Sequence, residues 1–202
     1  MPLIVFEGID GCGKSTQVGL LVERLRAEGI EPILLREPGG TKLGEEVRSL
    51  LLSRDTLAGP RAELFGYLMA RSQLVQERLK PALTAGETVV LDRFWYSTIA
   101  YQGHGLRLDL RKVRAAIELA IDGLSADLAL LLQIDPLRAA QRRESLADDR
   151  IEARGLSYLQ RVAQGYESLV DENELRPVNA DRSVEAVAAD VWSLVAPLLT
   201  HR

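Results

Sequence analysis

The sequence predicts an α/β fold with a mostly parallel, five-stranded sheet that helices cover on both faces, together with a short lid segment. Short apolar runs alternate with helical patterns along the whole chain, which is typical of parallel sheets built from strand–helix–strand units. The first run, residues 3–6, is uninterrupted, as expected of a strand buried on both faces. A glycine-rich turn and an amphipathic helix follow it directly. We expect residues 1–202 to form a single domain.

The expected elements follow the apolar runs in order. After the strand at 3–6, apolar residues spaced three and four positions apart predict a helix that ends near Gly29. Four further strands are expected at 33–35, 88–91, 128–134 and 177–179. Further helices are expected around 47–51, at 62–85 with a bend near Pro81, from about Ser97, around 113–121, at 156–169 and at 184–195. Asp135 and Pro136 are expected to end the strand at 128–134.

One segment departs from this alternation. Residues 141–154 are densely charged and lack an apolar stripe. We therefore expect a surface segment between helices rather than a packed element, and it is the candidate for the lid.

Composition and charge limit the function classes. The chain has 202 residues, of which 47% are hydrophobic and 27% charged, values typical of a globular protein. Lys and Arg number 25 against 29 Asp and Glu, so the formal net charge is −4 and any anionic ligand has to meet locally gathered cations. Cys12 is the only cysteine, which excludes an intrachain disulfide, and no apolar run approaches a membrane span. We expect a cytoplasmic protein without nucleic-acid or membrane partners.

The residues from Gly8 to Ser15 carry the strongest chemical signal. They match the pattern G-x-x-x-x-G-K-[ST] at every fixed position, between a strand and a helix as that phosphate-binding loop requires. The glycines allow backbone N–H groups to turn toward phosphate oxygens, and the helix N-terminus adds a positive dipole. Lys14 reaches the β and γ phosphates of a bound nucleotide, and Ser15 is a ligand for Mg²⁺. The fold class is therefore that of the P-loop NTPases.

The loop alone leaves kinases, GTPases, motors and nucleotide-sensing regulators open. A guanine-reading Asn-Lys-x-Asp run is absent, since the only asparagines are Asn173 and Asn179 in other settings. A motor is usually larger. At this length, with a charged segment between later helices, a small phosphotransferase with a closing lid is the class that we expect.

Several further runs agree with this class. They are Phe6-Glu7 before the loop, Arg36-Glu37-Pro38-Gly39-Gly40-Thr41, Asp92-Arg93-Phe94 with Ser97, Ala100-Tyr101-Gln102-Gly103, Arg150-Ile151-Glu152 and Asn179-Ala180-Asp181. With these runs the chain resembles the thymidylate kinase family over essentially its whole length. The resemblance implies ATP-dependent phosphorylation of dTMP to dTDP, with ATP as donor, Mg²⁺ as cofactor, and a homodimer.

The resemblance also implies site residues. The nucleotide-binding loop is Gly8, Asp10, Gly11, Cys12, Gly13, Lys14, Ser15 and Thr16. Asp92 and Arg93 follow a predicted strand at the carboxyl edge of the sheet, where Asp92 suits Mg²⁺ and Arg93 suits an acceptor phosphate, although a structural ion pair is the alternative. Arg48 resembles a second phosphate-holding arginine, with a solvated helix charge as its alternative. Asp10 resembles a carboxylate near the sugar 3′-hydroxyl.

A further group is expected around the acceptor base and sugar. Tyr67 and Arg71 are four apart on one helical face, which suits stacking on a base and bonding to its exocyclic oxygen. Phe65 is the alternative stacking residue. The alternative without a binding role is an aromatic residue in the core and an arginine on the surface. In the family Thr98 corresponds to the residue that bonds thymine N3, and Tyr101 to the one beside the sugar. The complete expected substrate-binding set is Asp10, Glu37, Pro38, Arg48, Tyr67, Arg71, Arg93, Ser97, Thr98, Tyr101 and Gln102. A cis peptide bond at Pro38 is a further hypothesis.

Some members of the family carry a catalytic arginine inside the phosphate loop, whereas others supply it from the lid. Gly11 occupies the loop position here, so the catalytic arginine is expected from the lid. The candidates are Arg142, Arg143 and Arg150, of which Arg143 is favoured. Residues 179–181 are expected to form a loop against adenine. A kinase for another nucleotide or small metabolite, and a regulator that binds ATP without turnover, remain the rival functions.

Overall fold

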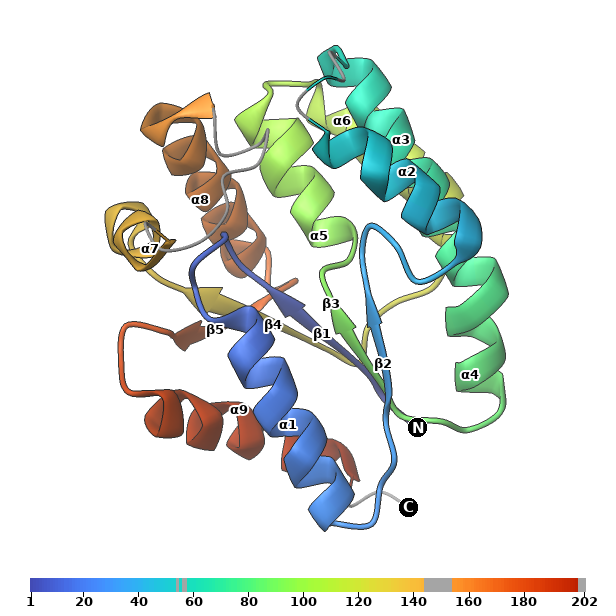
Figure 1. Ribbon diagram of the computed structural model, residues 1–202, viewed down its shortest axis with the longest axis vertical. Helices are drawn as coiled ribbons and strands as arrows, with labels where there is room; N and C mark the ends of the chain where they lie inside the picture. The colour runs from blue at the N-terminus through green and yellow to red at the C-terminus, as the bar shows by residue number, and fades with distance from the viewer. Residues whose placement is uncertain (54, 56–57, 144–153, 200–202) are drawn as a thin grey trace.

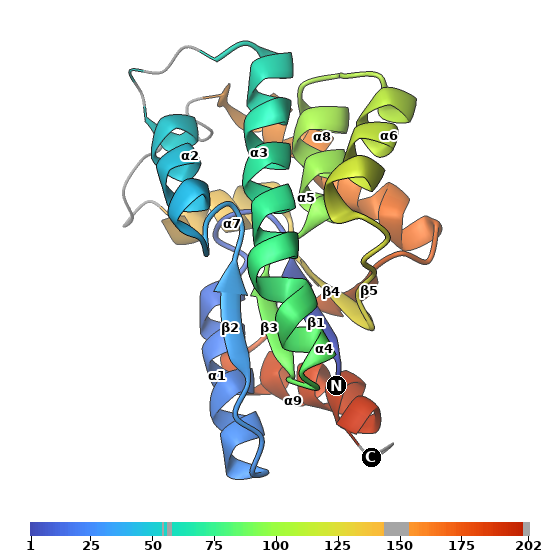
Figure 2. The ribbon, with the colours of Figure 1, turned by 90° about the vertical axis from the view of Figure 1, so that its right-hand side faces the viewer.

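The computed structural model describes residues 1–53, 55, 58–143 and 154–199. In this part of the chain, five strands form one parallel sheet in the order β2-β3-β1-β4-β5. The P-loop NTPase α/β fold predicted from the sequence is confirmed. Helices lie on both faces of the sheet: Figures 1 and 2 show α1 (Lys14–Ala27) and α9 (Val184–Leu199) on one face, with α3 (Pro60–Leu74) and α4 (Lys80–Thr84) on the other.

The strands follow the apolar runs closely. Their bounds are β1 (Leu3–Glu7), β2 (Ile33–Arg36), β3 (Val89–Asp92), β4 (Leu128–Gln133) and β5 (Arg176–Asn179). β1 is central, pairing with β3 through Leu3 and Val89 and with β4 through Glu7 and Leu131. All five of its residues are buried, because helices cover both faces of a central parallel strand. The phosphate loop therefore starts from the most enclosed strand of the sheet.

The remaining helices agree with the expected positions, except α7, which was not expected. They are α2 (Lys42–Leu52), α5 (Trp95–Thr98), α6 (Leu110–Ile121), α7 (Pro136–Arg143) and α8 (Leu156–Asp171). Thr41 caps α2 by accepting a hydrogen bond from Gly44 N, and Asp109 caps α6 through Arg111 N and Lys112 N. In the described part of the chain, none of the helices has the length and apolarity needed to cross a membrane.

Two π-helical turns were not predicted. The first, Val75–Leu79, joins α3 to α4. It precedes Pro81, whose ring has no N–H to donate and crowds the carbonyl of Glu77, so the helix is irregular one turn before the proline. The second, Ile99–Gly105, continues α5. Hydrophobic periodicity does not distinguish a π turn from an α turn over so few residues.

The expectation that Pro136 only ends β4, and that residues from 141 onward are unpacked, was wrong in part. Asp135 accepts hydrogen bonds from Leu137 N (2.8 Å) and Arg138 N (3.2 Å), so it caps α7. Pro136 is the first residue of that helix, where its missing N–H costs nothing. Residues 141–143 belong to α7, and residues 144–153 lie outside the described residues.

Candidate active site

The phosphate loop has the backbone that its sequence requires. Gly8, Gly11 and Gly13 have φ angles of 141°, 84° and 96°, a region that side chains with a Cβ rarely adopt. A Cβ at Gly8 would stand 2.8 Å from Leu132 O, so the glycine there is also required by packing against β4. Gly13 immediately precedes α1, whose first N–H groups open onto the loop. The geometry is that of an anion-binding helix N-terminus.

Lys14 folds back onto the loop. Its Nζ donates to Gly8 O (2.9 Å) and Ile9 O (3.2 Å) and lies 3.7 Å from Asp10 Oδ1. Cys12 is buried under it, 2% exposed. Ser15 and Thr16 are exposed in the first turn of α1, on the solvent side of the loop. The loop thus combines a fixed backbone with one cation whose present partners are backbone carbonyls and a carboxylate.

Asp92 ends β3 beside the loop. Its Oδ1 is buried and has no hydrogen-bond partner among the described residues. Asp92 and Ser15 line the same cavity of about 490 Å³, which also borders Arg36 and Gly40. A hydroxyl and a carboxylate are hard oxygen ligands, so this pair fits Mg²⁺, which usually keeps several waters and phosphate oxygens as its other ligands.

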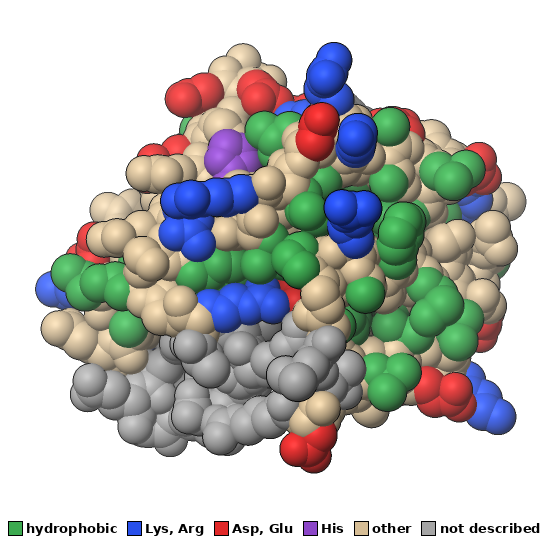
Figure 3. Space-filling view, turned by 90° about the horizontal axis from the view of Figure 1, so that it is seen from above, with side chains coloured by type: hydrophobic (Ala, Val, Ile, Leu, Met, Phe, Trp, Pro, Cys, Tyr) green, Lys and Arg blue, Asp and Glu red, His purple; other side chains and the backbone are tan. Residues whose placement is uncertain are grey.

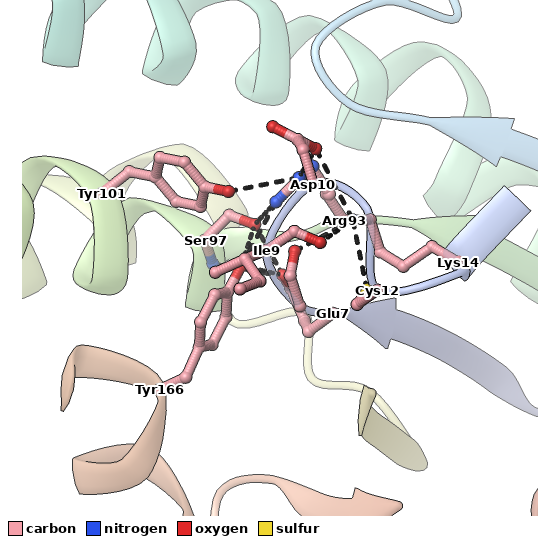
Figure 4. Close-up of polar contacts among 10 residues, drawn as sticks. Glu7, Ile9, Asp10, Cys12, Lys14, Arg93, Ser97, Tyr101 and Tyr166 are labelled. Atoms are coloured by element: carbon pink, nitrogen blue, oxygen red, sulfur yellow. Dashed lines mark hydrogen bonds and ion pairs between the residues drawn. The ribbon is translucent and has the colours of Figure 1, made fainter. Parts of the chain in front are cut away.

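Arg93 connects the loop to the opposite side of the site. Its guanidinium donates to Asp10 Oδ1 (2.5 Å), Ser97 Oγ (3.1 Å) and Tyr166 OH (3.2 Å). It also lies over the ring of Tyr101, 5.1 Å from the ring centre. Figure 4 shows these groups converging on Arg93 from the loop, from α5 and its continuation, and from α8. The predicted alternative for Arg93, an ion pair with its neighbour Asp92, is replaced by a contact with Asp10.

Arg93 also has an unusual backbone. Its φ is 70°, in the left-handed region that costs a residue with a Cβ about 1–2 kcal/mol. Arg93 N donates to Phe6 O (2.9 Å), so the chain turns sharply just after β3 while it remains attached to β1. This turn directs the side chain across the end of the sheet toward the phosphate loop.

Glu7 lies beneath this cluster. It is fully buried and accepts hydrogen bonds from Phe94 N (2.7 Å), Ser97 Oγ (2.5 Å) and Tyr166 OH (2.8 Å). Burial raises the pKa of Glu7, while Arg93 and these donors partly oppose the effect. Glu7 thereby fixes the hydroxyl groups that in turn bond Arg93. Sequence reasoning included Glu7 in the family pattern and assigned it no role.

A second cavity, of about 100 Å³, lies beyond Arg93. Its lining residues are Asp10, Glu37, Pro38, Arg48, Leu52, Tyr67, Arg93, Ser97, Thr98, Tyr101 and Gln102. The expected substrate-binding residues therefore come together here, Arg71 excepted, and Leu52 is the described lining residue that was not expected. The peptide bond before Pro38 is cis, as hypothesised. Phe65 is 64% exposed and absent from the lining, so Tyr67 is the aromatic residue of α3 that faces this cavity.

Arg71 is behind the cavity wall. It is 1% exposed, so the reading of a surface arginine was wrong. Its Nε donates to Glu37 Oε2 (2.8 Å), and its terminal nitrogens donate to Thr98 Oγ1 (2.7 Å) and Phe94 O (3.0 Å). Arg48, by contrast, lines the cavity and donates to Pro38 O (2.9 Å). Arg71 thus orients two residues of the wall.

Glu37 predicts a pH dependence of stability. Burial, only partly offset by the charge of Arg71, raises the pKa of Glu37 from 4.5 to about 7. Between these values the folded protein keeps a proton at Glu37 that the unfolded chain has released, so the free energy of unfolding falls as pH rises through this window. From pH 5 to pH 8 we expect the free energy of unfolding of the wild type to fall by about 1–3 kcal/mol more than that of Glu37→Gln. Urea unfolding at each pH measures it. Equal losses would contradict the assignment.

The predicted lid arginines lie elsewhere or are not described. Arg142 of α7 donates to Ala180 O (3.1 Å) and lies 3.4 Å from Asp181 Oδ1, so it contacts the loop after β5. Arg138 joins the same carboxylate at 2.8 Å. Of Arg143 the structure describes the backbone only, and Arg150 lies outside the described residues.

Figure 3 shows Lys and Arg side chains at several places on the upper face of the molecule, with apolar and acidic side chains between them.

Comparison with known proteins identifies the family. The family model described as "Thymidylate kinase" matches residues 6–191. The chain belongs to the thymidylate kinase family. It is 47% identical over 199 residues to a thymidylate kinase of Synechococcus sp. (strain RCC307), covering 95% of this chain and 94% of that protein. It is 43% identical over 185 residues to the thymidylate kinase of Caldanaerobacter subterraneus subsp. tengcongensis, covering 92% and 89%. The family and the kind of enzyme predicted from the sequence, an ATP-dependent phosphotransferase, are confirmed.

Sequence reasoning missed some residues around this thymidylate kinase site. Tyr166 bonds both Arg93 and Glu7, and Glu63 and Arg154 meet beside the second cavity. Tyr158 and Tyr166 lie eight residues apart on α8 and both are buried. That spacing was available from the sequence, although a stripe of aromatic residues is more often core than site.

Proposed function

We propose that the phosphate loop and the second cavity together carry out the ATP-dependent phosphorylation of dTMP to dTDP. The observation that supports the assignment is the contact between Asp10 and Arg93. Asp10 belongs to the phosphate loop and lines the second cavity, so donor and acceptor sites share one wall. A phosphoryl group held by the loop and an acceptor held in the cavity therefore meet at Arg93.

The donor site is the phosphate loop. Backbone N–H groups of Gly8, Gly11, Cys12, Gly13 and the first turn of α1, including Ser15 and Thr16, surround the phosphates of ATP. Lys14 leaves its carbonyl partners and neutralises charge on the β and γ phosphates. Ser15 and Asp92 would hold Mg²⁺, which would supply further charge neutralisation. Arg142 and residues 179–181 contact the adenine end of ATP. The protein acts in the cytoplasm, as expected from the sequence.

The acceptor site is the second cavity. Arg93 and Arg48 hold the phosphate of dTMP, and Tyr67 stacks on the base. Thr98 bonds the edge of the base, Arg71 supports Thr98 and Glu37 from behind the wall, Tyr101 lies beside the sugar, and Asp10 is near its 3′-hydroxyl. Glu37, Pro38, Ser97 and Gln102 complete the wall. The acceptor oxygen is anionic at neutral pH, so no general base is needed, and catalysis comes from alignment and charge neutralisation. Arg143, with Arg142 as the alternative, places a positive charge beside the phosphoryl group during its transfer.

The first test is ADP release from ATP and Mg²⁺ with dTMP, dUMP, ribosyl TMP, dCMP, dGMP or AMP as acceptor. A strong preference for dTMP supports the proposal. Another preferred acceptor would overturn the base-site assignment and leave a kinase. Tight ATP binding without stimulation by any acceptor would indicate the nucleotide-sensing regulator.

A homodimer is also proposed. Phe65 and Met69 lie one turn apart on α3, 64% and 47% exposed, and Leu50 of the adjacent α2 is 61% exposed. Large apolar side chains that are exposed on neighbouring helices are typical of an interface.

Phe65→Glu is therefore expected to weaken dimerisation by about 100-fold, because a buried Phe is replaced by an unpaired charge. The measurement is sedimentation equilibrium. Leu137→Glu on α7, where Leu137 is 53% exposed, is the matched control and should leave assembly unchanged. An unaltered dimer in Phe65→Glu would place the interface elsewhere.

A further inference from the structure

Three side chains outside the phosphate-binding machinery meet at one wall of the second cavity. Gln102 Nε2 donates to Glu63 Oε1 (3.0 Å). Arg154 donates to both carboxylate oxygens of Glu63, at 3.2 Å and 2.5 Å. Gln102 lines the cavity, whereas Glu63 belongs to α3 and Arg154 lies just before α8. A chain of hydrogen bonds thus runs from the residues just before α8, through α3, to the cavity.

The chain is buried and firmly held. Glu63 and Gln102 are each 2% exposed, and the Arg154 side chain is 20% exposed. Arg154 is held in turn by Tyr158, to whose hydroxyl it donates (3.0 Å) and over whose ring it lies (5.0 Å). Burying a carboxylate requires a cation and satisfied hydrogen bonds, and Arg154 supplies the cation.

This arrangement fixes the direction of the Gln102 amide. A carboxamide has a donor end and an acceptor end that differ little in shape, so its orientation depends on its partners. An ionised carboxylate only accepts hydrogen bonds, so Glu63 selects the NH₂ end of Gln102. The carbonyl oxygen is then the end that remains for a ligand in the cavity.

We propose that Glu63 and Arg154 are positioning residues that lock the Gln102 amide with its acceptor oxygen toward the nucleobase. The inference rests on the proposed function of the cavity. An acceptor oxygen matches a pyrimidine whose ring nitrogen carries a hydrogen, as N3 of thymine does. It opposes cytosine, whose N3 is itself an acceptor, so two lone pairs face each other. The pair thereby contributes to the choice of base without touching it.

The test is Glu63→Gln, which keeps the shape and replaces the carboxylate with a group that both donates and accepts. Gln102 is then no longer held in one orientation. We expect the ratio of kcat/KM for dTMP to that for dCMP to fall by about tenfold or more, with the KM for ATP unchanged. Arg154→Met should change the ratio in the same direction. Arg114→Met removes a comparable arginine, paired with Glu172 and Glu174 away from the cavity, and should leave the ratio unchanged.

A second pair of variants separates positioning from general structural support. If Glu63 acts through Gln102, Glu63→Gln introduced into Gln102→Ala has no further effect on the ratio. An equal fall in that background, an unchanged ratio in Glu63→Gln, or a similar fall in Arg114→Met would overturn the inference. A wild-type protein without preference for dTMP over dCMP would instead contradict the proposed function.

Discussion

Lys14→Met is expected to lower kcat by about 10³-fold while the protein remains folded. Lys14 is the cation of the phosphate loop, and its contribution increases as charge develops on the transferring group. Among the described residues, its Nζ bonds only carbonyls and side chains of the same loop, so in that part of the chain its loss leaves no distant partner unpaired. The Met side chain preserves most of the length of the Lys side chain. Steady-state ADP release with saturating ATP and dTMP measures the effect.

The control for this variant is Lys112→Met, which removes an exposed lysine at the start of α6. Both variants should unfold at nearly the wild-type temperature. Near-normal turnover by a folded Lys14→Met protein would rule out the proposed role of the loop.

Arg93→Lys is expected to reduce kcat/KM for dTMP by about 10²-fold, and Arg93→Met by about 10³-fold or more. Lysine retains the charge and loses the planar fork that bonds two oxygens at once. It also keeps the backbone cost of a φ of 70°, so the comparison isolates the guanidinium. Met in addition removes the guanidinium that Asp10 contacts and the positive charge that opposes the burial of Glu7.

Kinetics with each substrate varied in turn distinguish the role of Arg93. A rise confined to the KM for ATP would assign Arg93 to the donor. Equal activities of Arg93→Lys and Arg93→Met would show that the charge alone contributes nothing, and wild-type activity in both would show that the fork contributes nothing either.

The sequence predicted the parts of the fold that local patterns encode. The uninterrupted apolar run at residues 3–6 gave the central strand, and the fixed positions from Gly8 to Ser15 gave the loop and helix that follow. The capping signal at Asp135 and Pro136 was present and was interpreted only as the end of a strand. A proline after Asp is compatible with both readings, and only the hydrogen bonds from Leu137 N and Arg138 N distinguish them.

The wall of the acceptor cavity was predicted through the family resemblance rather than by local pattern. Gln102 and Arg48 are far apart in sequence, and only the resemblance assigned them to one site. The contacts that hold the wall were not predicted. Glu63 and Arg154 are separated by 91 positions, and a single sequence contains no signal for a pair so distant. The burial of Arg71 was missed for the same reason, since its partner Glu37 is 34 positions away.

The left-handed backbone at Arg93 bears on attempts to make this protein more heat-resistant. Glycine adopts that conformation without the steric cost, so position 93 would attract a stabilising design that considers the backbone alone. Such a design would remove the guanidinium that joins the two halves of the active site. Position 93 is therefore one where selection for catalysis and selection for stability favour different residues, and where a more stable chain is a less useful one.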